Sequence, residues 1–257
     1  MSKKIKILFI LDGFPSISTP FIINQMIGIV KDGHNLTILS RHKGNLDIIH
    51  KEVKNFNLLS KTVFFPPLNE SKTARIIYLF KNLHLFFGKH SYKYWNSLNP
   101  VKHGKYALSL RLFYETSGFL RLPTLDYDII HGQFGPLGLM AVRQRRNKTI
   151  SGRIITQFRG YDISKLFQFE PSNYYNELFK EGDWFLANCN FFAQKAIDKG
   201  APKNKISVQY SGIQTDKFAH PKNDFSINDG LKIVTVGRLA PKKGVKYILQ
   251  ALGQIKQ

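Results

Sequence analysis

Residues 5–40 read IKILFILDGFPSISTPFIINQMIGIVKDGHNLTILS, and this stretch decides the fold. Ile5–Leu11 is an apolar run of strand length, which we expect to form a buried strand. Ser18 or Thr19 can cap a helix whose first turn accepts the proline that follows, and apolar side chains then recur at helical spacing. Leu36–Leu39 is a second strand. A strand–helix–strand unit of this length is typical of a parallel sheet, and its turn lacks the G-x-G-x-x-G of dinucleotide dehydrogenases.

The alternation of strand and helix continues to residue 209. The further apolar runs are Asp128–His131, Ile154–Phe158, Trp184–Ala187 and Ile206–Gln209, and helical patterns begin at Pro136 and Phe191. Strands that alternate with helices imply an α/β fold with a parallel, doubly wound sheet. Ligands of such sheets bind at the carboxyl ends of the strands.

A separate strand–turn–helix pattern lies near the C-terminus, where residues 231–252 read LKIVTVGRLAPKKGVKYILQAL. We expect a strand at Leu231–Val236 and a helix at Val245–Leu252, joined by a basic turn. The start of a helix presents unpaired N–H groups and a positive dipole end, so this turn suits a phosphate. Because residues 219–230 contain little apolar material, they are the expected linker. The predicted domains are therefore residues 1–218 and the beginning of a second domain, residues 231–257.

The composition limits the class of protein and its partners. The chain has 257 residues, is 43% hydrophobic, and carries a net charge of +21 from 38 Lys and Arg against 17 Asp and Glu. Such a charge implies an acidic partner, which is nucleic acid, anionic lipid or a phosphorylated substrate, although a compositional bias of the genome also inflates lysine. The single cysteine, Cys189, excludes an internal disulfide and a cysteine-based zinc cluster. The lone cysteine fits the cytosol, so we expect a cytoplasmic protein, with a peripheral position on the inner face of the cell membrane as a further option. No apolar run is long enough to span a membrane.

Residues 71–114 contain no Asp or Glu, and they interleave lysines and arginines with aromatic residues. The pattern predicts a helix at Thr73–Phe87 with one apolar face. A basic, aromatic amphipathic helix lies well on an anionic membrane surface, where each Lys or Arg contributes roughly 1 kcal/mol. Two alternatives are a helix that faces the core and a platform for single-stranded nucleic acid. No nucleic-acid-binding motif accompanies the segment, which disfavours the second alternative.

Several of these motifs, taken in order, resemble the glycosyltransferase group 1 family, and within it the branch that makes colanic acid and other exopolysaccharides. That branch begins with a strand, F-P-x-x-S-E-T-F-I, a helix and G-H. The matching residues are Phe14, Pro15, Ser18, Phe21, Ile22, Gly33 and His34, while Thr19 and Pro20 replace the Glu-Thr pair. The resemblance implies the GT-B fold, in which two Rossmann-like domains face each other. Residues 231–257 would then be the first strand and helix of the second domain.

The resemblance also implies which residues form the acceptor side of the site. Gly13, Phe14 and Ser18 would line the cleft, and the segment DIIHGQFG would bring His131, Gln133 and Phe134 to it. His131 would be catalytic, although a lone histidine is more often structural.

Where the family reads H-G-Y-D, this chain reads RGYD, so Arg159 replaces the histidine near the transferring sugar. An arginine stays protonated and cannot act as a general base, but it can bind a phosphate bidentately. Asp162 would orient an acceptor hydroxyl or cap the following turn. By the same resemblance, Arg238 and Lys243 would hold the donor diphosphate.

The implied function is transfer of a sugar from a nucleotide-sugar to a lipid-linked or oligosaccharide acceptor, without a metal ion or other cofactor. Because the sequence ends soon after the basic turn, we expect a fragment, or half of a split enzyme that a second polypeptide completes. Activity of the chain alone is then doubtful. Two other classes stay open, namely a noncatalytic acceptor- or membrane-binding module and an unrelated nucleotide-phosphate-binding α/β protein.

Overall fold

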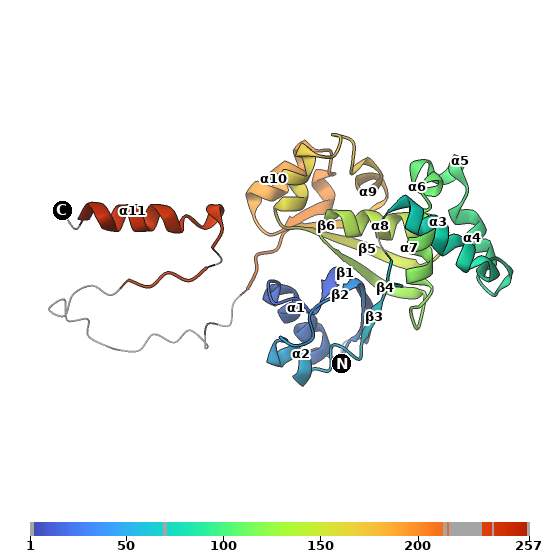
Figure 1. The fold of residues 1–257 in the computed structure, drawn as a ribbon, viewed down its shortest axis with the longest axis horizontal. Coiled ribbons are helices and arrows are strands. Elements are labelled where there is room, and N and C mark those ends of the chain that lie inside the picture. The colour runs from blue at the N-terminus through green and yellow to red at the C-terminus, as the bar shows by residue number, and fades with distance from the viewer. Residues whose placement is uncertain (1–2, 69–70, 213–214, 216–232, 238, 256–257) are drawn as a thin grey trace. The chain divides into compact units, whose positions relative to one another are not determined.

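The computed structural model describes residues 3–68, 71–212, 215, 233–237 and 239–255 (Figure 1). The chain divides into two compact units, residues 1–212 and 213–257, and each is described by itself. The predicted boundary at residue 218 and the predicted linker, residues 219–230, lie outside the described residues.

The first unit is built on a seven-stranded parallel sheet in the order β3-β2-β1-β4-β5-β6-β7. The strands are β1 Lys6–Phe14, β2 Asn35–Lys43, β3 Thr62–Phe64, β4 Asp126–Gln133, β5 Ser151–Phe158, β6 Trp184–Ala187 and β7 Ile206–Val208. The strand order runs outward from β1 in one direction and from β4 in the other. The predicted α/β fold with a doubly wound, Rossmann-like sheet is therefore confirmed.

Helices connect the strands. They are α1 Pro20–Lys31, α2 Lys51–Asn55, α3 Lys72–Lys81, α4 Ser91–Ser97, α5 Pro100–His103, α6 Lys105–Leu108, α7 Arg111–Phe119, α8 Gly135–Arg146, α9 Asn176–Glu181, α10 Asn190–Asp198 and, in the second unit, α11 Val245–Ile255. Thr19 occupies the N-cap position of α1 but makes no side-chain cap, because its hydroxyl donates instead to the Ser16 carbonyl at 3.3 Å.

Different helices cover the two faces of the sheet (Figure 1). Successive side chains of a strand point to opposite faces. In β1, Leu8 and Ile10 pack in the cluster formed with α7, α8, α9 and α10, whereas Ile7, Phe9 and Leu11 pack in the cluster formed with α1 and α2. Both faces of the central strands are covered, which is why these strands read as continuous apolar runs.

Glycines bring α8 very close to the strands beneath it. A Cβ on Gly138 would lie 2.1 Å from Thr156 Oγ1, and a Cβ on Gly132 would lie 2.6 Å from the Gly138 nitrogen. Only glycine permits this approach. The close packing fixes the end of β4 and the connection to α8, where the predicted site residues His131, Gln133 and Phe134 lie.

An inserted helical segment, α3 to α7, lies between β3 and β4 and has its own small core of Phe86, Tyr94 and Phe113. The predicted continuous helix at 73–87 is wrong in part, since α3 ends at Lys81 and a 3-10 turn, Leu83–Phe87, follows. The predicted apolar face, Ile76, Ile77, Phe80, Leu83 and Phe87, is exposed. The predicted face therefore does not face the core, and α3 contacts the small core through other side chains, Tyr78 and Leu79.

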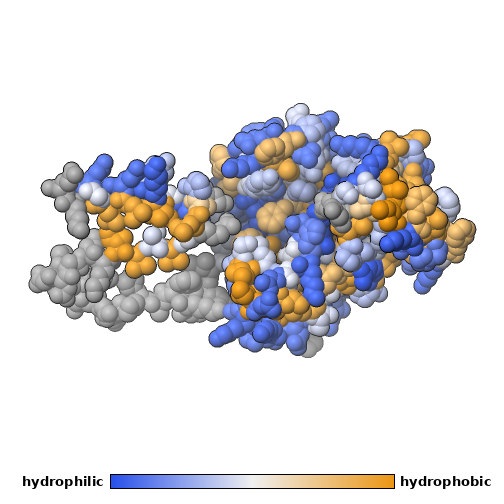
Figure 2. Space-filling model, viewed as in Figure 1, coloured by the Kyte–Doolittle hydropathy of each residue, from blue (hydrophilic) through white to orange (hydrophobic). Residues whose placement is uncertain are grey.

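In the second unit, the predicted helix after the basic turn is confirmed as α11, which Figure 2 shows with one hydrophobic and one hydrophilic side. The predicted strand at 231–236 is not found in its described part, residues 233–236. A strand needs a neighbouring strand for its N–H and C=O groups, and no described residue pairs with this segment. In the described parts of both units, no helix has the length and apolar character that crossing a membrane requires.

Candidate functional site

The candidate site lies at the carboxyl ends of β4 and β5, on the face that α1 covers. His131 and Gln133 are two positions apart in β4 and therefore share this face. In the sheet register, Gln133 lies opposite Gln157, and Arg159 follows two positions later. The fold thus brings together three residues predicted from the sequence, His131, Gln133 and Arg159.

A network of glutamines holds Arg159. Gln133 Nε2 donates to Gln25 Oε1 at 2.9 Å, and Gln25 Nε2 donates to Gln157 Oε1 at 3.2 Å. Arg159 Nη2 donates to Gln157 Oε1 at 2.8 Å and to Gln25 Oε1 at 3.3 Å. Gln25 and Gln157 were not predicted from the sequence. The available signal was a polar residue inside an apolar strand and another on the helix that follows the first strand.

Arg159 is a half-buried cation in a fixed position. Its Cζ lies 4.1 Å from the centroid of the Phe21 ring, and its Nη1 donates to Ser211 Oγ at 3.2 Å. Burial lowers the pKa of Arg159 to about 10, so the guanidinium remains charged near neutral pH. Its buried Nε has no hydrogen-bond partner among the described residues. This arrangement suits the binding of an anion.

His131 is buried and neutral. Its ring packs edge-to-face on Phe9 at 4.7 Å between centroids, and its Nε2 has no partner in the described part of the chain. Burial, together with the positive charge of Arg159, lowers the pKa of His131 to about 3. A group with so low a pKa is a poor general base near neutral pH, and a neutral hydrogen-bonding role fits it better.

Asp162 joins two loops at this edge of the sheet. Its Oδ2 accepts from the Gly135 N–H at 2.9 Å, and its Oδ1 accepts from the N–H groups of Arg159 and Gly160, both at 3.0 Å. Burial raises the pKa of Asp162, and these N–H groups act in the opposite direction. Only 2% of the residue is exposed, so its carboxylate positions the backbone around Arg159 rather than facing an acceptor hydroxyl.

The other predicted acceptor residues lie at the carboxyl end of β1. Gly13 and Phe134 line a cavity of about 470 Å³ there. Phe14 was expected in the cleft but is 1% exposed and packs in the cluster formed with α1 and α2, so the end of β1 departs from the strict alternation of its earlier residues. Ser18 is exposed, with its Oγ 3.2 Å from Ser16 Oγ.

Of the predicted diphosphate-binding residues, Arg238 lies outside the described residues. Lys243 is exposed in the turn before α11, where Gly244 adopts a left-handed backbone with a φ of 69°. The described residues contain no group of three or more His, Cys, Asp or Glu side chains placed to hold a metal ion.

Comparison with known proteins confirms the resemblance predicted from the sequence. The chain is 28% identical over 254 residues to WcaL of Salmonella typhimurium, which is named as a colanic acid biosynthesis glycosyltransferase, and 28% identical over 255 residues to AmsK of Erwinia amylovora, an amylovoran biosynthesis glycosyltransferase. Each match covers 98% of this chain and 61% of the relative. No protein-family model matches.

A solved structure, Alr3699/HepE of Anabaena in complex with UDP and glucose, has a similar fold. It aligns with a TM-score of 0.51 at 12% identity, and the match covers 85% of this chain and 47% of that one. This likeness supports the Rossmann-like fold of the first unit.

Proposed function

We propose that this chain forms the acceptor side of a glycosyltransferase that moves a sugar from a nucleotide-sugar to a lipid-linked or oligosaccharide acceptor in exopolysaccharide biosynthesis. The similarity to glycosyltransferases of this kind covers nearly the whole chain. The observation that carries the proposal is the fixed cation, Arg159, at the ligand-binding edge of a doubly wound sheet.

In the proposed reaction Arg159 stabilises negative charge. A guanidinium held by the glutamine network needs no reorganisation when a phosphate or the leaving diphosphate develops charge beside it. Neither residue suits the role of general base near neutral pH, because Arg159, with a pKa of about 10, stays protonated and His131, with a pKa of about 3, binds a proton too weakly. The nucleotide-sugar enters as a substrate, and we propose no resident metal ion.

Transfer of a radiolabelled sugar from a panel of UDP- and GDP-sugars to extracted membrane lipids and oligosaccharides tests this proposal. The assay uses the 257-residue chain alone and supplemented with the remaining C-terminal part of the Erwinia relative. We expect incorporation in at least the supplemented reaction, and a roughly 100-fold loss in Arg159→Gln. Arg153→Gln, at the other end of β5, is the matched control and should retain activity. Absence of transfer from every donor in both reactions would contradict the proposal and favour a noncatalytic module.

We further propose that the inserted helices rest on the cytoplasmic face of the membrane, next to a lipid-linked acceptor. Exposed apolar side chains gather there, with exposed fractions of 66% for Phe80, 85% for Phe87 and 58% for Trp95. Figure 2 shows hydrophobic surface over α3 and α4, interrupted by hydrophilic residues. Lysines are interleaved with these residues in the sequence and no acidic residue occurs from Ser71 to Tyr114, so the surface fits anionic lipid.

Flotation with vesicles tests the membrane proposal. We expect the chain to float with vesicles that contain phosphatidylglycerol. With vesicles of phosphatidylcholine alone, it should remain at the bottom of the gradient. Phe80→Ser/Phe87→Ser should weaken flotation, whereas Phe191→Ser, which alters an equally exposed ring on α10, should not. Equal recovery with both vesicle types would refute the proposal. Binding to single-stranded RNA in place of vesicles would point to the nucleic-acid alternative.

A further inference from the structure

A cavity of about 590 Å³ lies within the inserted helical segment, apart from the Arg159 network. Its lining comes from α3, from the turn that follows α3, from the residues before α4, and from α7 and the residues after it. No acidic side chain occurs among the described residues that line it, and its basic side chains are Lys89, Arg121, His84 and His90. It shares no lining residue with the glutamine network, so the two places can be occupied independently.

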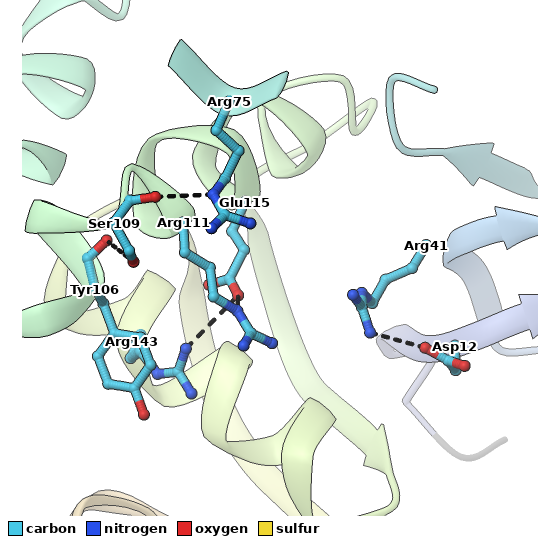
Figure 3. A network of polar contacts seen from close by, with 8 residues as sticks. All are labelled: Asp12, Arg41, Arg75, Tyr106, Ser109, Arg111, Glu115 and Arg143. Carbon is cyan, nitrogen blue, oxygen red and sulfur yellow. Dashed lines mark hydrogen bonds and ion pairs between the residues drawn. The ribbon is translucent and has the colours of Figure 1, made fainter. Parts of the chain in front are cut away.

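The arginines of the inserted segment around another cavity are already engaged within the protein. That cavity has a volume of about 360 Å³ and is lined from β2, α3, α6 and α7. Figure 3 shows two of these contacts: Arg75 Nε donates to the Ser109 carbonyl at 2.8 Å, and Arg111 Nε donates to Glu115 Oε1 at 2.9 Å. These guanidinium groups are held by groups of the fold itself.

Lys89 and Arg121, at the larger cavity, differ in this respect. Both residues are exposed, and neither side chain makes a hydrogen bond or an ion pair with another described residue. The positive charge at this cavity also acts on His90, whose pKa is lowered by burial and by the charges of Lys93 and Lys89. The lining thus combines available cations with a positive potential, and this favours an anionic ligand.

A buried tyrosine adds a neutral donor to the cavity. Tyr94 lines the cavity and is 5% exposed, and its hydroxyl has no hydrogen-bond partner in the described part of the chain. The hydroxyl of Tyr78, in contrast, donates to Ser117 Oγ at 3.1 Å. Burial raises the pKa of Tyr94 to about 12, so its hydroxyl keeps its proton at neutral pH. An anionic oxygen in the cavity would accept that hydrogen and satisfy the group.

Apolar groups form other walls and continue onto the exposed surface. Leu85 and Leu120 line the cavity, and Leu85 belongs to the 3-10 turn Leu83–Phe87. The same turn ends in Phe87, whose exposed fraction is 85%, and Lys89 follows two residues later. One short segment therefore carries both a solvent-exposed ring and a cation of the cavity. An anion with apolar groups attached fits this arrangement better than free phosphate does.

We propose that this cavity binds the phosphate head group of an anionic membrane lipid. Lys89 and Arg121 contact the phosphate, the Tyr94 hydroxyl donates to it, and the leucines contact the glycerol part of the lipid. The proposal rests on the proposed membrane contact of the inserted helices and adds a specific lipid site to it. A surface that acts by charge alone requires only a negative bilayer, whereas this cavity recognises single lipid molecules.

Binding of a soluble short-chain lipid tests the site without a membrane. Dihexanoylphosphatidylglycerol, kept below its micelle concentration, is added to the 257-residue chain while NMR follows the His90 ring. The His90 signal is identified by its absence in His90→Gln. We expect saturable binding that raises the pKa of His90, because a bound anion offsets the charges of Lys89 and Lys93.

Two further probes define the ligand. Inorganic phosphate lacks the apolar part, and dihexanoylphosphatidylcholine carries a cation that cancels the charge of its phosphate. Each should bind at least about tenfold more weakly than dihexanoylphosphatidylglycerol. The affinity for dihexanoylphosphatidylglycerol should fall as the salt concentration rises, because charge contributes to binding.

Variants assign the binding to this cavity. Lys89→Gln, Arg121→Gln and Tyr94→Phe should each weaken lipid binding about tenfold, since each removes a hydrogen-bond donor to the phosphate. Lys203→Gln and Arg153→Gln are the matched controls. They remove the same charges from exposed positions outside the inserted helices and should have no effect. Thermal unfolding of each variant establishes that it is folded.

The proposal is overturned if the lipid leaves the His90 signal unchanged, or if either further probe binds as tightly as the lipid. Equal weakening by the control variants would also overturn it. A shift of the His90 signal by a single-stranded oligonucleotide but not by the lipid would assign the cavity to nucleic acid instead.

The measurement uses no vesicle and no sugar transfer. Failure of flotation with intact lipid binding would therefore count against the membrane surface, and failure of the transfer assay would count against the proposed enzyme. Loss of lipid binding with both of those assays intact would count against this cavity alone.

Discussion

Arg159 Nη2 donates a 2.8 Å hydrogen bond to Oε1 of Gln157, which lies two positions earlier in the same strand run. Gln157 is 1% exposed, and its Oε1 also accepts from Gln25. One amide oxygen thus ties the cation of the site to β5 and to α1. The position of the positive charge is consequently a property of the sheet, not of a loose loop.

Replacing Gln157 by Leu should impair both stability and the site. The change leaves the Arg159 and Gln25 donors without their shared acceptor, which costs roughly 1–3 kcal/mol for a buried polar group. Urea unfolding measures the loss. Transfer activity should fall because Arg159 is no longer held. Gln209→Leu, just after β7, is the control and should leave the free energy of unfolding within about 0.5 kcal/mol of wild type.

His131 should make stability fall in mild acid. Its pKa is about 3 in the folded chain and about 6.5 when exposed, so the unfolded chain binds an extra proton between these values. Stability from this group is present above pH 6.5 and is lost as the pH falls toward 3. From pH 7 to pH 4 the loss is roughly 3 kcal/mol.

His131→Gln removes the titrating group and keeps an amide in its place. We expect the difference in unfolding free energy between wild type and this variant to change steadily across pH 7 to pH 4. A difference that stays constant with pH would show that His131 has the same pKa in the folded and the unfolded chain, and would contradict its burial as a neutral group.

Gly138→Ala should destabilise the first unit by about 1–3 kcal/mol. The added Cβ would lie 2.1 Å from Thr156 Oγ1, so α8 must move away from the sheet. Gly28→Ala in α1 is the matched control, since nothing lies within 4 Å of a Cβ at that position. There alanine should stabilise by roughly 0.5–1 kcal/mol through its higher helix propensity. A lower melting temperature for Gly138→Ala and a higher one for Gly28→Ala would confirm the close approach of α8 to the sheet.

Asp162→Asn should lower stability by about 1–3 kcal/mol, because the amide nitrogen cannot accept from a backbone N–H. Guanidinium chloride unfolding measures this loss. Asp198→Asn is the control, since Asp198 is exposed and its carboxylate accepts a hydrogen bond from the nearby Gln194 side chain on the same helix. If Asp162→Asn unfolds like wild type yet abolishes transfer, then Asp162 acts on substrate and not on the loops.

Local sequence patterns were enough to predict most of the sheet, but not its short edge strand β3. Strands β4, β5 and β6 and helices α1, α8 and α10 were expected within a few residues of their observed bounds. Their signals are apolar runs, helical spacing and glycine or proline at the ends, all of which act between near neighbours. The pattern overestimated the length of the helix at 73–87. The helix ends before Asn82 because of packing in the small core around Phe86, which a local pattern does not report.

The site was predicted only in part. Resemblance pointed to His131, Gln133 and Arg159, which the fold does bring together. Gln25 was not predicted as a site residue, because its partners Gln133 and Gln157 are 108 and 132 residues away in the sequence. No local pattern reports such contacts. Phe14 was expected in the cleft, but it packs with Ile7, Phe9 and Leu11 against the strict alternation of β1, and a local irregularity of this kind leaves no signal in the sequence.

The sequence by itself determined the parallel sheet, its carboxyl edge and the positive charge of the chain, because periodicity and composition are read directly from the residues. Only the tertiary structure decided which polar groups meet at that edge. It neutralised His131 by burial, turned Asp162 toward backbone N–H groups, and gathered cations from β2, α3, α6 and α7 around one cavity. Those properties arise from contacts between segments that are distant in the sequence and from removal of water on burial. No local sequence pattern predicts either of them.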